Sequence, residues 1–200
     1  MHTAIKIDFR RWIQQRFGMF VLAIFIAGCH SVAKKTNLPN SATAIPASTG
    51  VVVVGVSGNA SAVFRMGTLF ENGSFEHDGR STEFTSESQK PYIVQALPPT
   101  TNAKRYALLR ASLGGKDYEF ECGQVLPILT VKSGAVQYYG DFTVLVDEGK
   151  LKVKQSFDLP KAQQFIDQNY PRSGWTLQQG ELERARSTQC LQVPPAAIVG

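Results

Sequence analysis

The chain has 200 residues, 43% of them hydrophobic, and carries 21 Lys and Arg against 16 Asp and Glu, a formal net charge of +5. Four of these basic residues and one acid lie within the first 28 positions, so the remainder holds 17 basic against 15 acidic residues, a net charge of +2. No stripe of Lys and Arg remains in it, which excludes the electrostatic footprint of a nucleic-acid-binding protein.

The N-terminus has the pattern of an export signal. Basic residues precede an apolar run from Phe17 to Gly28. As a helix, this run would be about 18 Å long, which is too short for a hydrocarbon core of about 30 Å. Residues 1–28 are therefore predicted to be a removable signal peptide. The general secretion route is favoured, and the Arg10-Arg11 pair leaves the twin-arginine route open.

The apolar run ends in Ile26-Ala27-Gly28-Cys29, which resembles the lipobox of bacterial lipoproteins. The resemblance implies that the Cys29 thiol is acylated, with chains such as palmitate, and that cleavage makes this cysteine the membrane-anchored N-terminus. A cleaved signal followed by an ordinary cysteine is the alternative. In lipoprotein sorting, a residue other than aspartate after the cysteine, here His30, implies the outer membrane, with the protein facing the periplasm.

Residues 29–49 are predicted to be a lipidated cysteine and a flexible tether, because they are rich in small polar residues and proline. About 150 residues follow, enough for one domain with its own core. Residues 71–90 are predicted to be rich in turns. The short β-type runs and the turn signals between them predict a mainly β, antiparallel sandwich over 50–171. The predicted strands are 51–56, 62–70, 92–97, 105–113, 118–122, 125–131, 136–146 and 151–157.

The first of these strands, Val51-Val52-Val53-Val54-Gly55-Val56, is typical of a strand covered on both faces or of a sandwich core. An amphipathic helix is predicted over 158–170, because Asp158 can cap it and Pro160 suits its first turn. The remaining residues, 172–200, are predicted to be a C-terminal extension.

Several glycine-containing pairs predict turns. Ser133-Gly134 and Glu148-Gly149 stand at hairpin spacing between predicted strands. Gly140 is expected to seat a bulge beside Tyr138 and Tyr139. The side chains of these two tyrosines should point to opposite faces of the strand, one inward and one outward.

Besides Cys29, the chain has two cysteines, Cys122 and Cys190. In an oxidising envelope compartment, such an even pair predicts a disulfide that ties the C-terminal extension back to the domain. The loop that it closes has about 69 residues and would contribute about 4 kcal/mol by the chain-entropy argument. Two buried free thiols are the alternative.

Part of the predicted sandwich resembles small bacterial lipoproteins of a family without characterised function. Over about residues 96–171, a Leu-Pro-Pro turn precedes a Tyr-x-Leu strand, a Val-x-Tyr-x-Gly-Asp strand follows, and the helix ends in Tyr-Pro. These motifs are Leu97–Pro99, Tyr106–Leu108, Val136–Asp141 and Tyr170-Pro171. The chain departs from the family pattern at Thr100 and Leu129, which replace a glycine and an aromatic residue. The resemblance implies a prealbumin-type sandwich, as in carboxypeptidase regulatory-like modules.

Candidate catalytic residues are few. Ser57 follows the valine-rich strand, but the stretch lacks the Gly-Lys-Ser/Thr ending of a phosphate loop, and Asn59 stands where a nucleophile elbow has glycine. His77 is the only histidine of the predicted domain, and a solvated turn histidine is the favoured interpretation. A small envelope hydrolase that uses Ser57 or His77 is the alternative function.

The carboxylates predict no metal site. Asp141, Asp147 and Glu148 lie on the predicted hairpin after Tyr139, without the alternating carboxylates of a calcium loop. No metal, nucleotide or other cofactor is predicted.

The sequence thus predicts a non-catalytic binding or structural module of the bacterial envelope and not an enzyme. Its expected partners are the membrane, through the lipid, and a protein or glycan of the envelope. Large aromatic residues supply much of the energy of protein interfaces, so they are the candidate contacts. They are Tyr106, Tyr138, Tyr139 and Trp175.

Overall fold

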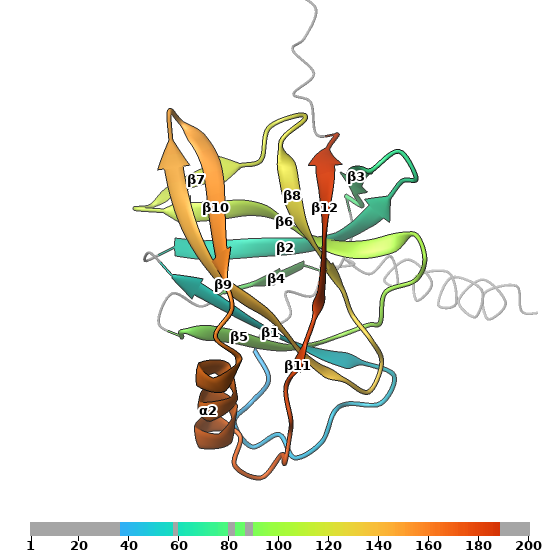
Figure 1. Cartoon of the computed structure of the whole chain (residues 1–200), viewed down its shortest axis with the longest axis vertical. Helices are drawn as coiled ribbons and strands as arrows, with labels where there is room; N and C mark the ends of the chain where they lie inside the picture. Colours follow the sequence, from blue (N-terminus) through green and yellow to red (C-terminus); the bar gives the residue numbers. More distant parts are fainter. Residues whose placement is uncertain (1–36, 58–59, 80–82, 87–89, 189–200) are drawn as a thin grey trace, which may run out of the picture. The chain divides into compact units, whose positions relative to one another are not determined.

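A computed structural model describes residues 37–57, 60–79, 83–86 and 90–188. These residues form twelve strands and one helix, labelled α2 (Figure 1). The prediction of a mainly β fold is therefore confirmed. No helix in this part of the chain has the length and apolar character needed to cross a bilayer. The predicted signal peptide, Cys29 and Cys190 lie outside the described residues.

One sheet has the strand order β10-β9-β1-β5, and a short strand, β11, also pairs with β9. β1 and β9 run parallel, whereas β5 and β10 run antiparallel to their neighbours. We call this sheet the central sheet. Its strands are β1 (Gly50–Ser57), β5 (Tyr92–Leu97), β9 (Val136–Asp147), β10 (Lys150–Ser156) and β11 (Gln178–Gln179).

The second sheet contains a closed ring of five strands, in the order β2-β3-β12-β8-β6 and back to β2. We call this ring the barrel. β4 is added to it at β2, and β7 is added at β6. The strands of this sheet are β2 (Ala60–Leu69), β3 (Ser74–His77), β4 (Glu83–Thr85), β6 (Lys104–Leu113), β7 (Lys116–Glu119), β8 (Val125–Thr130) and β12 (Glu181–Ser187).

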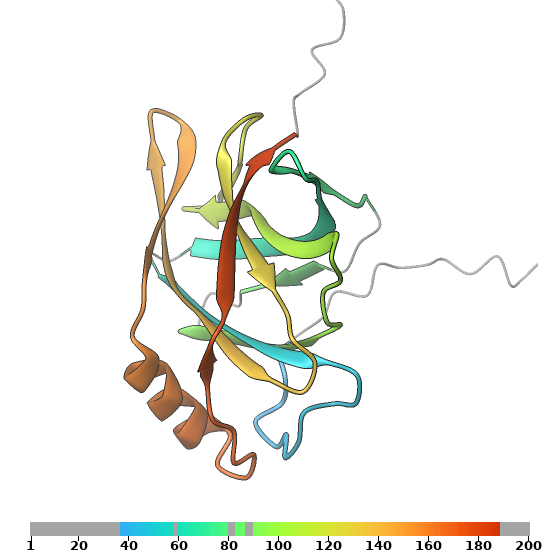
Figure 2. The same ribbon diagram turned by 45° about the vertical axis from the view of Figure 1, so that its right-hand side comes forward.

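β1 is buried on both faces because the central sheet is the middle layer of the fold. Val52 and Val54 belong to the core between the central sheet and the barrel, whereas Val51 and Val53 belong to the core beneath α2. Figures 1 and 2 show the barrel strands on one side of β1 and β5 and the helix on the other. A doubly covered strand requires apolar residues on both faces, so the β-branched run is explained and its prediction is confirmed.

The helix α2 (Leu159–Asn169) agrees with the predicted helix. The Asp158 carboxylate caps it by accepting a hydrogen bond from the Lys161 N–H at 3.1 Å. Ala162 and Ile166, four residues apart, form its buried face and pack on the central sheet. The chain then turns back under the sheet, where Trp175 continues the same core.

The predicted antiparallel sandwich is wrong in two respects. The pairings β1–β9, β11–β9 and β3–β12 are parallel, and the second sheet closes on itself. Glu148-Gly149 does form the predicted hairpin, between β9 and β10. Ser133-Gly134 instead carries the chain from β8 in the barrel to β9 in the central sheet. Turn residues indicate where the chain reverses, but they do not indicate which strand it joins next.

Two segments that the sequence analysis places outside the predicted sandwich belong to the fold. Residues 181–187 of the C-terminal extension are β12. In the predicted tether, the Leu38 N–H donates a hydrogen bond to the Val94 carbonyl at 2.7 Å, and the Tyr170 hydroxyl donates one to the Leu38 carbonyl at 3.0 Å. Leu38 also packs against the core beneath α2. The described part of the tether therefore covers the edge of β5.

Replacing Ile166 with alanine tests how much the fold depends on α2. Ile166 is 1% exposed, so Ile166→Ala should lower the free energy of unfolding by about 2–4 kcal/mol, through lost burial and a residual cavity. Gln164→Ala, on the exposed face of the same helix, is the matched control and should change it by less than about 0.5 kcal/mol. Urea unfolding followed by circular dichroism measures both. Equal effects of the two substitutions would contradict the docking of the helix.

Candidate functional site

Four residues lie in one row across the central sheet, one from each of its four long strands. Tyr92 of β5 is paired with Gly55 of β1, Gly55 with Asp141 of β9, and Asp141 with Ser156 of β10. Residues paired in this way share a face, so the side chains of Tyr92 and Asp141 flank Gly55. A Cβ atom at position 55 would lie 1.9 Å from Asp141 Oδ1 and 3.2 Å from Tyr92 Cε1. The Asp141 carboxylate therefore packs directly over Gly55, where only glycine leaves room for it, and we call this arrangement the Gly55 site.

A bulge in β9 places Asp141 in this row. The pairing of β9 with β1 shifts by one residue between Tyr138 and Asp141. Gly140 has a φ of 97°, a conformation that favours glycine, so the predicted bulge is confirmed. Beyond the bulge, Phe142 joins Tyr139 in the core toward the barrel. Asp141 consequently shares with Tyr138 the face toward α2, whereas a regular strand would turn it to the opposite face.

Two tyrosine hydroxyls accompany the Asp141 carboxylate. The Tyr138 hydroxyl accepts a hydrogen bond from the Asp158 N–H at 3.2 Å. Tyr92 is 4% exposed, and its hydroxyl interacts with the Asp141 carboxylate without forming a hydrogen bond of good geometry. Burial and then the negative charges of Asp141 and Asp158 raise the pKa of Tyr92 to about 12. Burial likewise raises the pKa of Tyr138 above its usual range. Both phenols are therefore neutral at physiological pH.

Aromatic rings flank the two tyrosines. The ring of Phe165 lies 4.9 Å from that of Tyr92 between centroids, and the ring of Phe157 lies 6.2 Å from that of Tyr138, edge to face. Phe157 is 48% exposed, so the aromatic cluster reaches the surface. The Gly55 site thus combines carboxylate, phenol and aromatic groups at the end of the sheet where α2 begins.

No Lys or Arg of the described residues forms an ion pair with the carboxylates of this site. Asp141 is half-buried and Asp158 is exposed, and neither takes part in an ion pair among the described residues. The Asp158 carboxylate accepts the helix-capping hydrogen bond instead. Nowhere in the described ranges do three or more His, Cys, Asp or Glu side chains gather as they would to hold a metal ion.

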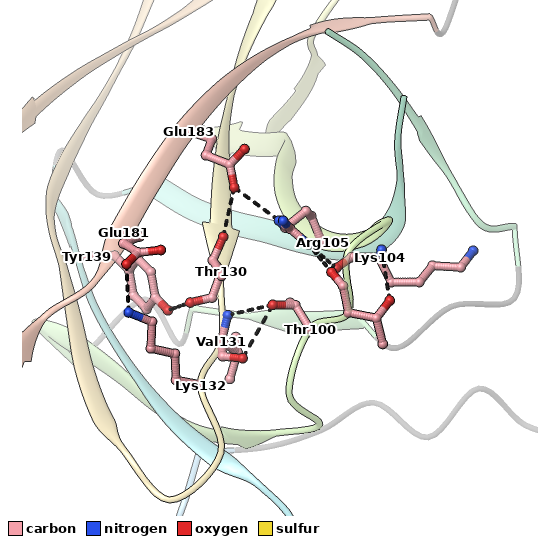
Figure 3. Close-up of polar contacts among 10 residues, drawn as sticks. Thr100, Lys104, Arg105, Thr130, Val131, Lys132, Tyr139, Glu181 and Glu183 are labelled. Carbon is pink, nitrogen blue, oxygen red and sulfur yellow. Dashed lines mark hydrogen bonds and ion pairs between the residues drawn. The ribbon is translucent and has the colours of Figure 1, made fainter. Parts of the chain in front are cut away.

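A second polar cluster, on the barrel, is paired within itself (Figure 3). Glu183 of β12 accepts hydrogen bonds from Arg105 Nε at 3.1 Å and from Thr130 Oγ1 at 2.9 Å. Glu181 forms an ion pair with Lys132 at 2.6 Å. Each of these carboxylates therefore already has a cation, and the cluster links β12 to β6 and β8. Its arrangement indicates a structural role more than a binding role.

The four aromatic residues predicted as partner contacts are buried. Tyr106, Tyr138 and Tyr139 are 0% exposed, and Trp175 is 7% exposed. The prediction that Tyr138 and Tyr139 point to opposite faces is confirmed, because they belong to different cores. The expectation that one of them is exposed is wrong, since α2 and the barrel cover both faces of the sheet. These residues stabilise the fold and do not form a contact surface.

Ser57 and His77 lie on different sheets and share no contact. The Ser57 side chain is exposed at the end of β1, with its Oγ 3.0 Å from Thr143 Oγ1. His77, at the end of β3, lines a cavity of about 270 Å³ with its Nδ1 unpartnered. The other residues that line this cavity are Phe75, Glu76, Gly79, Leu109, Ser187 and Thr188. The geometry therefore does not bring the two candidate hydrolase residues together.

No single pattern in the sequence identifies the Gly55 site as a unit. Asp147, which the sequence places on the same predicted hairpin as Asp141, lies at the far end of β9 and pairs with Lys152. The usable signals are the glycine that interrupts the valine run and the Gly140-Asp141 pair after two tyrosines. Relating these signals requires the register of β1 with β9, which no local pattern contains.

The chain matches no protein-family model, no curated protein and no solved structure. The resemblance to bacterial lipoproteins therefore stays a prediction that rests on the motifs themselves.

Contacts near Cys122 bear on the predicted disulfide. Cys122 is disulfide-bonded, and the other cysteines of the chain lie outside the described residues. The Gly123 N–H donates a hydrogen bond to the Ser187 carbonyl at 2.8 Å, and the Ser187 N–H donates one to the Gln124 carbonyl at 2.9 Å. Cys190 follows Ser187 by three residues, a reach of at most about 10 Å. These contacts favour the predicted pairing of Cys122 with Cys190.

Peptide mapping tests this pairing. The denatured, unreduced protein should resist alkylation at both cysteines, and digestion should yield one peptide that contains Cys122 linked to Cys190. In Cys122→Ser, Cys190 should become reactive, and the free energy of unfolding should fall by about 2–4 kcal/mol, because the unfolded chain loses a constraint. Alkylation of both cysteines in the unreduced wild type would contradict the pairing.

Tyr92→Phe tests whether the Tyr92 hydroxyl is unpartnered. The lost hydroxyl has no hydrogen bond to contribute, so the free energy of unfolding at pH 7 should stay within about 0.5 kcal/mol or rise. Tyr138→Phe is the control and should lower it by about 1 kcal/mol, because the Asp158 N–H loses its acceptor. A larger loss in Tyr92→Phe than in Tyr138→Phe would contradict this assignment.

Tyr92→Phe should also change how the free energy of unfolding depends on pH. The pKa of Tyr92 rises from 10.0 to about 12 on folding, so between these pH values the folded state holds its proton more tightly than the unfolded chain does. Stability contributed by this proton is complete below pH 10 and is lost as the pH rises toward 12. The decline should be shallower in Tyr92→Phe than in the wild type when urea unfolding is repeated across that range.

Proposed function

We propose that this chain is a lipid-anchored module of the bacterial cell envelope that binds a partner instead of catalysing a reaction. The observation that carries the proposal is the motif Ile26-Ala27-Gly28-Cys29 at the end of a short apolar run that follows basic residues. A diacylated and N-acylated cysteine holds a protein stably at a membrane, since two lipid chains suffice for this. The outer membrane, facing the periplasm, is the proposed location.

The way in which the chain enters the domain supports this proposal. The Asn37 side chain accepts a hydrogen bond from the Val94 N–H at 3.0 Å, and Leu38 is bonded to the same residue of β5. Cys29 precedes Asn37 by eight residues, which span at most about 28 Å. A lipid on Cys29 would therefore keep β5 and its surroundings close to the bilayer surface.

Binding is favoured over hydrolysis by the arrangement of the polar groups. The Ser57 hydroxyl is bonded to Thr143, and the unpartnered His77 Nδ1 lies on the other sheet, so neither activates the other. At the Gly55 site, in contrast, Asp141 forms no ion pair with another described residue, and the Phe157 ring that contacts Tyr138 is 48% exposed. Such groups recognise a ligand and need no reaction step. A protein or a glycan of the envelope is the proposed class of partner.

Metabolic labelling with a radioactive or clickable fatty acid tests the anchor. The wild-type chain should carry the label and sediment with membranes, whereas Cys29→Ala should lose both properties, because it has no thiol to acylate. Cys122→Ala is the matched control and should keep the label. Retention of the label in Cys29→Ala would overturn the proposal, as would its absence from the wild type.

A further inference from the structure

The cavity of about 270 Å³ beside His77 lies at the end of the barrel where β3 and β12 both end (Figure 1). These two strands are parallel, and Ser187 is paired with Phe75, so their last residues lie side by side. The Thr188 N–H and hydroxyl both donate to the Phe75 carbonyl, at 3.1 and 3.0 Å, and hold the two ends together. An apolar cavity of about 150 Å³ holds benzene, so this one has space for a substituted single ring. We call it the His77 cavity.

The imidazole of His77 provides an independent indication of a ligand. His77 is half-buried and lines the cavity, and its Nδ1 atom is buried without a hydrogen-bond partner among the described residues. Buried polar atoms in proteins are nearly always hydrogen-bonded, so an unpartnered nitrogen beside a cavity requires an explanation. An imidazole has two nitrogens that can form hydrogen bonds. The cavity therefore offers hydrogen-bonding capacity that the described part of the chain does not use.

The other lining residues restrict the chemistry of that ligand. Phe75 and Leu109 supply apolar surface, and a Cβ atom at Gly67 would lie 2.5 Å from Phe75 Cζ, so the absence of a side chain there accommodates the ring. Glu76 is the only charged residue among the described ones that line the cavity. It is exposed, and its side chain leaves β3 on the face opposite to Phe75 and His77. A charged ligand would therefore lose its hydration without gaining a counter-ion, which favours an uncharged one.

We propose that the His77 cavity binds a small uncharged molecule that has one apolar ring and one hydroxyl group, of the size of a simple phenol. The ring packs against Phe75 and Leu109, and the hydroxyl forms a hydrogen bond with the His77 imidazole. A hydroxyl both donates and accepts, so it suits either ring nitrogen. The inference goes beyond the proposed function, because it concerns neither the lipid anchor nor the protein or glycan partner.

The test is an NMR titration of the full chain, purified in detergent, with 4-methylphenol. We expect saturable shifts centred on the amide signals of Phe75, His77 and Leu109, with a dissociation constant of about 1 mM, as suits a ligand of few atoms. Toluene has the same ring and methyl group without the hydroxyl, so it should bind about three- to tenfold more weakly. The anion 4-methylbenzoate should give no saturable shifts at these signals, because its charge would be buried without a cation.

Substitutions assign the hydrogen bond to His77. His77→Phe keeps a ring at this position and removes both nitrogens, so it should bind 4-methylphenol about three- to tenfold more weakly and leave the affinity for toluene unchanged. Gln164→Ala, on the exposed face of α2, is the control and should change neither affinity. Circular dichroism shows whether each variant is folded. The comparison of 4-methylphenol with toluene in the wild type needs no variant, so it tests the inference even if His77→Phe does not fold.

Four results would each overturn the inference. They are an unsaturable titration with 4-methylphenol, equal affinities of the wild type for 4-methylphenol and toluene, saturable binding of 4-methylbenzoate at the same signals, and a folded His77→Phe variant that binds 4-methylphenol as tightly as the wild type. Saturable shifts confined to other parts of the domain would also reject the His77 cavity as the site. These outcomes are separate from those of the lipid labelling, which does not involve this cavity.

Discussion

The structure depends on the parallel pairing of β1 with β9 and on the bulge that interrupts it. β1 is buried on both faces, as β5 is, and β9 is the longer of the two strands beside β1, with side chains in both cores. The extra residue at Gly140 reverses the faces of β9 partway along its length. Tyr138 and Asp141 therefore face α2, whereas Tyr139 and Phe142 face the barrel. Both hydrophobic cores and the Gly55 site are positioned by this one irregularity.

The passage from the central sheet to the barrel is the second constraint. Gly180 lies between β11 and β12, and its N–H donates a hydrogen bond to the Tyr138 carbonyl at 2.8 Å. A Cβ atom there would lie 2.5 Å from Tyr139 Cε1, so the chain crosses directly over that ring. The Tyr139 hydroxyl in turn donates to the Thr130 carbonyl of β8. Burial of the Tyr139 ring contributes more free energy to this passage of the chain than the nearby ion pairs do, because ion pairs with exposed partners contribute little stability.

Much of the strand content could be predicted from the sequence, because β-branched runs and glycine turns act locally. The predicted strand 92–97 agrees with β5 at both ends, and the Asp158 cap and Pro160 locate the helix within a residue. β12 could not be predicted, because in Glu181–Ser187 only Ala185 and Ser187 are buried, which gives no clear alternation. The closed barrel and the parallel pairings depend on which distant strands pair with one another. A local sequence pattern contains no information about that pairing.

The Gly55 site could not be predicted from the sequence for a related reason. A valine run predicts a covered strand, but it does not say which residues of other strands fill the row beside its glycine. The aromatic residues were expected to be partner contacts because large aromatic side chains supply interface energy. In the structure, Tyr138 and Trp175 lie in the core beneath α2, and Tyr106 and Tyr139 lie in the core toward the barrel. Size and aromatic character alone therefore indicate burial as readily as binding.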